Sequence, residues 1–140
     1  MKILIAADGS AYTKRMLAYL AAHDEWLGNQ HEYTVLNVVA SLPGRAASVL
    51  DRDALKSFYA DTSEAVLKPI RTFFKKQGIE AEYLGKVGHA AEVIAKIAAA
   101  QNYDLLVMGS HGHGALGNLV LGSVTNKVLA GCHTPVLLVR

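Results

Sequence analysis

The sequence is poor in the residues and runs that typify disulfide-bonded or membrane proteins. Its 140 residues include one cysteine, Cys132, and three prolines. A single cysteine excludes an internal disulfide and fits a reducing compartment. The apolar run between Lys2 and Asp8 is too short for a signal-peptide core, and no apolar stretch is long enough to span a bilayer. We therefore expect a cytoplasmic protein with no membrane partner.

A strong charge of either sign is also missing. Fourteen Lys and Arg residues against twelve Asp and Glu residues give a formal net charge of +2, spread along the chain. Without a basic stripe, we expect no nucleic-acid partner. One local imbalance stands out, because no acidic residue follows Asp104 up to Arg140. Nothing acidic in that segment would repel an anion.

The apolar pattern predicts one folded domain over residues 1–140. Hydrophobic residues make up 51% of the chain and charged residues 19%, as in globular proteins. Strand and helix patterns alternate, which predicts a doubly wound α/β fold with a parallel sheet covered by helices on both faces. We expect a loop of about ten residues from Pro43 and a kink or split of the long helix at Pro69. The expected strands are 2–7, 33–39, 79–87, 104–108 and 134–139, and the expected helices are a first one ending near 28, then 51–77, 90–100 and 120–130.

The most informative motif follows the fourth expected strand, which ends at Met108. Gly109 and Gly112 are separated by two residues, and nine further residues lead to Gly122-Ser123. Glycine lets a ligand approach the backbone where a Cβ atom would clash. A glycine loop that leads into a helix presents free N–H groups and a positive dipole end to an anion. The motif therefore predicts a phosphate-binding loop rather than simple tight turns.

Other segments are expected to meet this loop. In doubly wound sheets, ligands bind outside the carboxyl ends of the strands, where the winding reverses. If the first and fourth strands are central neighbours, Asp8 and Gly109 leave the sheet side by side, and Val38 and Val39 reach the same edge. The site would then hold a carboxylate, an apolar backbone segment and a phosphate loop. Asp8 also suits the start of a helix, and the two valines also suit a strand core.

These residues resemble the universal stress protein family over essentially the whole chain. The resemblance rests on the glycine spacing, on Asp8-Gly9-Ser10 after the first strand and on the closing segment 134–139. It implies a five-stranded parallel sheet in the order 3-2-1-4-5, like that of the adenine nucleotide alpha hydrolases, and membership of the ATP-binding branch. It further implies a stress-response regulatory module that binds ATP, ADP or AMP, with Asp8 contacting ribose or a Mg²⁺ ion and Val38 contacting adenine. The candidate binding residues are Asp8, Gly9, Ser10, Val38, Val39, Met108, Gly109, Ser110, His111, Gly112, His113, Gly114, Gly122, Ser123 and Val124.

The chain departs from the family pattern in its charges. Many ATP-binding relatives carry Arg or Lys after the second glycine and further basic residues before the third. This chain has His113, Gly117 and Asn118 at those places. The change lowers the expected affinity for a triphosphate and favours a monophosphate, and His113 would make binding pH-sensitive.

Other readings of the same residues are weaker. The segment 112–117 matches the dinucleotide fingerprint, but it follows the fourth strand and has no acidic residue downstream. His111 and His113 have no Cys or carboxylate nearby in sequence to complete a zinc site. Slow ATP hydrolysis or phosphate transfer is the alternative function. Efficient catalysis is not expected, because the loop offers no Lys or Arg to neutralise a transferred phosphate.

The last expected strand predicts self-association. Residues Val136–Val139 are apolar and would lie at an edge of the sheet, where free backbone groups favour pairing. The chain ends at Arg140, so no later segment is expected to cover this edge. We therefore expect a homodimer through this strand.

Overall fold

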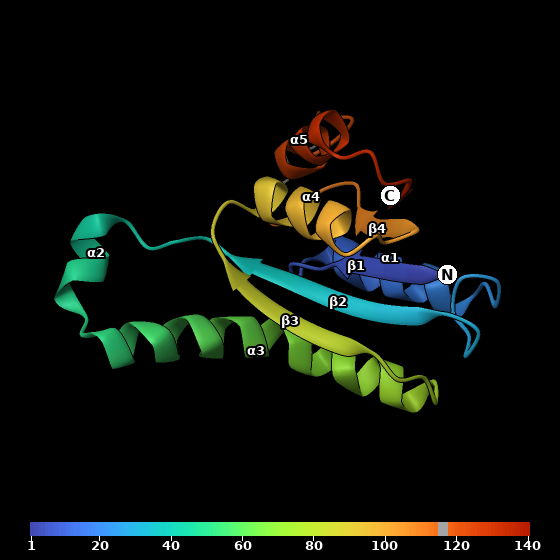
Figure 1. Ribbon diagram of the computed structural model, residues 1–140, viewed down its shortest axis with the longest axis horizontal. Helices are drawn as coiled ribbons and strands as arrows, with labels where there is room; N and C mark the ends of the chain where they lie inside the picture. Colours follow the sequence, from blue (N-terminus) through green and yellow to red (C-terminus); the bar gives the residue numbers. More distant parts are fainter. Residues whose placement is uncertain (115–117) are drawn as a thin grey trace.

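The computed structural model describes residues 1–114 and 118–140 and forms a three-layer α/β sandwich (Figure 1). The five strands are all parallel and lie in the order β3-β2-β1-β4-β5. This confirms the predicted fold class and strand order. The strands are β1 (Lys2–Ala6), β2 (Glu32–Val39), β3 (Glu82–Val87), β4 (Leu105–Gly109) and β5 (Val136–Val139), and the helices are α1 (Ala11–Ala21), α2 (Gly44–Val49), α3 (Arg52–Lys76), α4 (Ala90–Ala100) and α5 (Ser123–Gly131).

The central strands are apolar on both faces, because helices cover both. In β1, Ile3 and Ile5 pack with α1 and α3, while Leu4 and Ala6 pack with α4 and α5. All four side chains are buried. β1 pairs with β2 on one side and with β4 on the other, so that Ala6 lies opposite Leu36 and Met108. The carboxyl ends of these three strands therefore meet at one edge of the sheet.

The first helix is shorter than the sequence predicts. α1 ends at Ala21 rather than near Gly28. Leu27 is still buried, but from a loop that the Tyr33 hydroxyl holds in place. This hydroxyl accepts a hydrogen bond from the Gly28 N–H at 2.8 Å and donates one to the Trp26 carbonyl at 2.9 Å. The apolar pattern correctly predicted that Leu27 is buried, but it wrongly predicted that the helix extends to it.

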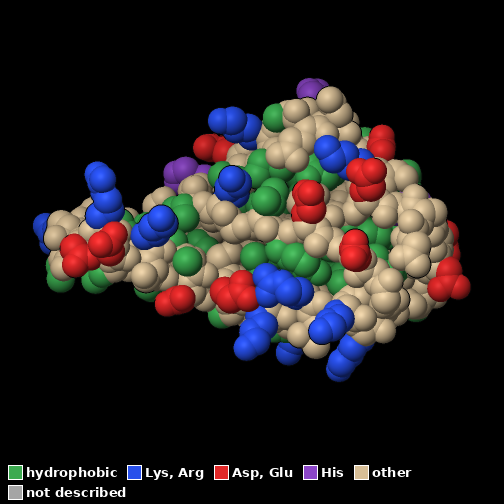
Figure 2. Space-filling model, turned by 60° about the horizontal axis from the view of Figure 1, so that its bottom comes forward, with side chains coloured by type: hydrophobic (Ala, Val, Ile, Leu, Met, Phe, Trp, Pro, Cys, Tyr) green, Lys and Arg blue, Asp and Glu red, His purple; other side chains and the backbone are tan. Residues whose placement is uncertain are grey.

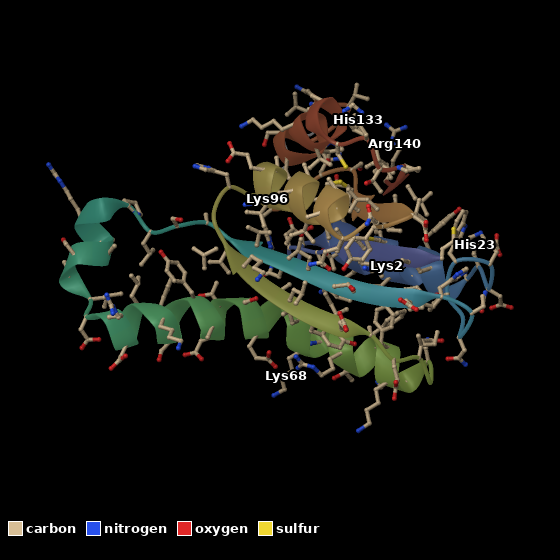
Figure 3. The ribbon with its side chains drawn as sticks, viewed as in Figure 1. Lys2, His23, Lys68, Lys96, His133 and Arg140 are labelled. Carbon is tan, nitrogen blue, oxygen red and sulfur yellow. The ribbon has the colours of Figure 1, made fainter. Side chains whose placement is uncertain are left out.

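The long helix crosses Pro69 without a break, which corrects the expectation of a split. α3 begins after Asp51, whose carboxylate accepts a hydrogen bond from the Ala54 N–H at 2.7 Å. Leu67 and Ile70, on either side of the proline, are buried against the sheet. The free energy gained by this packing outweighs the roughly 3 kcal/mol by which a proline destabilises a helix interior. Lys68, between them, points away from the sheet (Figure 3).

The segment after β2 differs most from expectation. The predicted loop from Pro43 contains the short helix α2, and α2 with the first turns of α3 projects away from the sheet (Figure 1). Val49 in this projection is 83% exposed and Phe58 40% exposed. On the face displayed in Figure 2, acidic and basic side chains are interspersed, including over the projecting part.

Candidate functional site

The turn after β1 holds Asp8 in one orientation. The Asp8 Oδ1 atom accepts hydrogen bonds from the Ser10 N–H at 2.9 Å and from the Thr13 hydroxyl at 3.1 Å. The same hydroxyl accepts from the N–H groups of Asp8 and Gly9, at 3.2 and 3.1 Å. Gly9 allows this tight turn because its φ of +79° is one that residues with a Cβ atom rarely adopt. The turn therefore fixes the carboxylate through Oδ1 and directs Oδ2 toward the glycine loop.

The glycine loop approaches this turn more closely than other residues would allow. A Cβ atom on Gly112 would lie 2.6 Å from Asp8 Oδ2, and one on Gly109 would lie 2.8 Å from the Cβ atom of Tyr12. At the far end of the loop, a Cβ atom on Gly122 would lie 3.1 Å from the His111 Cα. A Cβ atom at Gly109 or Gly112 would therefore force a shift, and one at Gly122 would be tight, where the turn, the loop and the start of α5 meet.

Hydrogen bonds connect the two ends of the loop. The Gly122 N–H donates to the Ser110 carbonyl at 2.8 Å, and the Thr125 hydroxyl donates to the Gly109 carbonyl at 3.2 Å. Ser123, Val124 and Thr125 form the first turn of α5, where backbone N–H groups have no partner within the helix. The loop therefore delivers the positive end of α5 to the carboxyl edge of the sheet.

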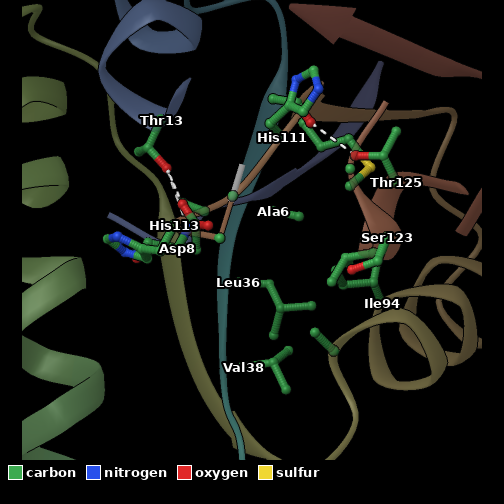
Figure 4. A pocket seen from close by; sticks show the side chains of 18 of the residues that line it. Ala6, Asp8, Thr13, Leu36, Val38, Ile94, His111, His113, Ser123 and Thr125 are labelled. Atoms are coloured by element: carbon green, nitrogen blue, oxygen red, sulfur yellow. Dashed lines mark hydrogen bonds between the residues drawn. The ribbon is translucent and has the colours of Figure 1, made fainter. Parts of the chain in front are cut away.

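A cavity of about 320 Å³ lies between these segments (Figure 4). One part of its wall is apolar and comes from β2 and α4, with Leu36, Val38 and Ile94. The other part comes from the Asp8 turn, the loop and the start of α5. The full lining is Ala6, Ala7, Asp8, Thr13, Leu36, Val38, Ala90, Ile94, Met108, Gly109, His111, Gly112, His113, Gly114, Leu119, Gly122, Ser123, Val124 and Thr125.

The charged groups of the cavity are few. Within the described part of the chain, its ionisable lining residues are Asp8, His111 and His113, with no Lys or Arg. The His113 Nε2 donates to the Asp8 backbone carbonyl at 2.7 Å, so this histidine secures the turn that carries the carboxylate. An anion in this cavity would therefore depend on backbone N–H groups and the helix dipole more than on fixed cationic side chains.

The structure brings most of the predicted site residues together. Eleven line the cavity, and four do not: Gly9 and Ser10 belong to the turn below it, Val39 is buried beside Val38, and Ser110 is fully buried beneath the loop. Over residues 1–114 and 118–140, no three His, Cys, Asp or Glu side chains are grouped as metal ligands. Gly117 and part of the 112–117 fingerprint lie outside the described residues.

Sequence reasoning missed several residues of the wall. Leu36 lies two positions before Val38 on the same face of β2, so strand alternation could have found it. Thr125 follows the Gly-Ser pair by two positions in the first turn of the helix. Thr13 and Ile94 carried no signal, because their role depends on how α1 and α4 pack on the sheet.

The fold and the site place the protein in a class, and comparisons identify the family within it. A parallel sheet in the order 3-2-1-4-5, with a glycine loop at the carboxyl end of its fourth strand, defines a doubly wound α/β protein. Residues 1–140 match the family model described as the universal stress protein family. The chain belongs to the universal stress protein family.

Individual relatives agree with this membership. A universal stress protein of Thermus aquaticus is 34% identical over 139 residues, which cover 99% of this chain and 97% of the relative. A universal stress protein of Synechocystis is 33% identical over 141 residues, and the match covers 99% of this chain and 42% of that longer protein.

Solved structures share the fold. The structure of protein MJ0577 of Methanocaldococcus jannaschii has a TM-score of 0.82 and 28% identity, with 99% of this chain and 94% of that one covered. A universal stress protein family protein from Arabidopsis thaliana, solved with AMP bound, has a TM-score of 0.71 and 16% identity, covering 99% of this chain and 90% of that one. A universal stress protein in complex with cAMP has a TM-score of 0.63 and 19% identity, covering 100% of this chain and 96% of that one.

Within the described residues, no helix is both long and apolar enough to cross a membrane.

Proposed function

We propose that this protein binds an adenine nucleotide, AMP or ATP, in the cavity above the carboxyl ends of β1, β2 and β4. The observation that carries the proposal is the division of the cavity wall. Leu36, Val38 and Ile94 offer an apolar slot for a base, and the glycine loop with the start of α5 offers N–H groups for phosphate. Asp8 lines the same cavity and would contact the ribose. Universal stress proteins of the same fold have been solved with AMP and with cAMP, which supports this ligand class.

The motif spacing supports membership of the ATP-binding branch, and the charges favour a monophosphate. Gly109, Gly112 and Gly122 keep the spacing of that branch, and a Cβ atom at each would make a close contact. No Lys or Arg lines the described part of the cavity, so no cationic side chain there would neutralise a triphosphate. We therefore propose nucleotide binding as the function, with the bound ligand regulating stress-response contacts of the protein, rather than efficient ATP hydrolysis.

Asp8 is the residue that would hold Mg²⁺ if the ion accompanies the nucleotide. Its Oδ2 accepts no hydrogen bond from the described residues. Mg²⁺ is commonly bound by one or two carboxylates together with phosphate oxygens and waters, and a single carboxylate fits that pattern. The ion would neutralise phosphate charge.

Identification of co-purified ligand tests the proposal directly. The protein is purified without added nucleotide, denatured, and its released small molecules are identified by mass spectrometry. Calorimetric titration with AMP, ADP and ATP then gives the affinity of each. Asp8→Ala and Gly122→Val should remove binding while circular dichroism stays native. Absence of heat and of a melting shift with all three nucleotides would refute the proposal.

We also propose a homodimer through β5. This strand lies at the edge of the sheet, and Val136, Leu137 and Leu138 are partly exposed. Free backbone groups on an apolar edge strand favour pairing with another strand. Sedimentation at micromolar concentration should give a dimer, and a Leu137→Lys variant should sediment as a monomer.

The expected cytoplasmic location rests on the single cysteine and is tested by cell fractionation.

A further inference from the structure

The protein itself uses both ring nitrogens of His111. The Nδ1 atom lies 2.9 Å from the Ser110 Oγ, and the Nε2 atom lies 2.8 Å from the Leu119 carbonyl oxygen. A carbonyl oxygen can only accept, so Nε2 carries the proton and Nδ1 of the neutral ring accepts from the Ser110 hydroxyl. Both nitrogens are thereby engaged before any ligand arrives.

The surroundings of His111 fix the ring further. Its centroid lies 4.9 Å from that of Tyr12 on α1, with the two ring planes 36° apart. The Arg15 guanidinium lies 5.0 Å from the same Tyr12 ring. Ser110, which donates to Nδ1, is completely buried. The His111 ring is thus held between Ser110 and Tyr12 of α1, which indicates a structural role.

The bond to Leu119 reaches a part of the loop that the other contacts do not. The Gly122–Ser110 and Thr125–Gly109 bonds join the two ends of the loop at the sheet. His111 instead joins the first half of the loop to a residue eight positions further on. Leu119 also lines the cavity. Loss of this bond would free residues 118–121, while the Gly122–Ser110 and Thr125–Gly109 bonds would remain.

We propose that His111 is a positioning residue that holds residues 118–122 in place before α5 and does not itself contact the phosphate. The inference rests on the proposed nucleotide function. It assigns phosphate contact to the backbone N–H groups near Gly112 and Gly122, and it predicts that the bond to Leu119 protects residues 118–122 in the ligand-free protein.

Two substitutions separate support of the loop from contact with phosphate. His111→Gln places an amide N–H near the position of Nε2 and can still donate to the Leu119 carbonyl, whereas His111→Asn reaches only the position of Nδ1. We expect the Asn variant to bind AMP roughly tenfold more weakly, the loss of about one hydrogen bond, and the Gln variant to stay within about threefold of the parent. His133→Asn is the control, because His133 is exposed beyond the end of α5 (Figure 3).

A second readout does not depend on the nucleotide. Amide hydrogen exchange over residues 118–122 of the ligand-free protein should be faster in the Asn variant and unchanged in the Gln and control variants. Equal weakening of AMP binding by Asn and Gln, with unchanged exchange in both, would overturn the inference in favour of direct contact. If the Asn variant does not fold, faster exchange in a folded Gln variant would overturn it. Failure of the parent protein to bind any nucleotide would refute the proposed function alone, because the exchange comparison still tests the support of the loop.

Discussion

Gly112→Ala should disturb Asp8 and little else. The new Cβ atom would lie 2.6 Å from Asp8 Oδ2, closer than the 3.0 Å that real Cβ contacts essentially never undercut. The backbone itself tolerates alanine here, because Gly112 is not among the described glycines with positive φ, which are Gly9, Gly78 and Gly88. The carboxylate must therefore turn, or the loop must move away from it.

The size of the effect follows from the bonds that Asp8 makes. Turning the carboxylate strains its two bonds at Oδ1, from the Ser10 N–H and from the Thr13 hydroxyl. Each bond to a charged acceptor contributes about 1.5–3 kcal/mol when it is fully buried. Asp8 is only partly buried, so water replaces part of this loss. We expect the free energy of unfolding to fall by about 1–2 kcal/mol, and the affinity for AMP to fall by about 10- to 100-fold, equivalent to about 1.4–2.8 kcal/mol.

A double-mutant cycle isolates the contact. Asp8→Ala, Gly112→Ala and the double variant are compared by urea denaturation, and calorimetric titration with AMP compares the parent protein with Gly112→Ala. Without the carboxylate, Gly112→Ala should change the free energy of unfolding by less than about 0.5 kcal/mol. Gly114→Ala is the matched control for the urea measurement, because a Cβ atom at this position would have no atom of the described residues within 4 Å. Additive effects of Asp8→Ala and Gly112→Ala would refute the contact on which the site is built.

Three further predictions concern stability and the loop. Burial raises the pKa of the Tyr33 hydroxyl above its ordinary value of 10.0, outweighing the Gly28 hydrogen bond that lowers it. As the pH rises, the unfolded chain therefore loses this proton before the folded protein does. The contribution of Tyr33 to the free energy of unfolding is complete below pH 10 and is lost as the pH rises further. In urea denaturation, Tyr33→Phe should show a smaller fall of the free energy of unfolding at alkaline pH. Phe74→Ala removes a fully buried ring and should lower the free energy of unfolding by about 3–5 kcal/mol, measured in the same way. Gly122→Val should abolish AMP binding in calorimetry with native circular dichroism, because its Cβ atom would press on the His111 Cα; retained binding would show that the loop can move without loss of function.

The sequence predicted the meeting of Asp8 with the glycine loop because topology determines it. An alternating pattern of strands and helices leads to a parallel sheet, and parallel strands end at one edge. Asp8 follows β1 and Gly109 ends β4, which are neighbours in the sheet. Burial was also predictable, since Leu27 and Ile79 are buried as their apolar character suggests.

Element boundaries were less predictable, because an apolar pattern reports burial and not conformation. Ile79 lies in a turn before β3, where its N–H donates to the Phe74 carbonyl, and the strand begins only at Glu82. The last helix begins at Ser123 rather than Val120, since the Gly122 N–H is used by the Ser110 carbonyl. These outcomes depend on hydrogen bonds between residues far apart in sequence, or on a tight turn, and neither leaves a periodic signal.

The threonine hydroxyl beneath Asp8 has a consequence for the thermodynamics of ligand capture. Thr13 accepts from two N–H groups and donates to the carboxylate, so that side chain has lost its rotational freedom during folding. A ligand that contacted Asp8, as proposed, would not have to restrict this side chain as well. The entropy cost of orienting the Asp8 carboxylate is therefore part of the free energy of folding. A ligand that bound there would find the carboxylate already oriented.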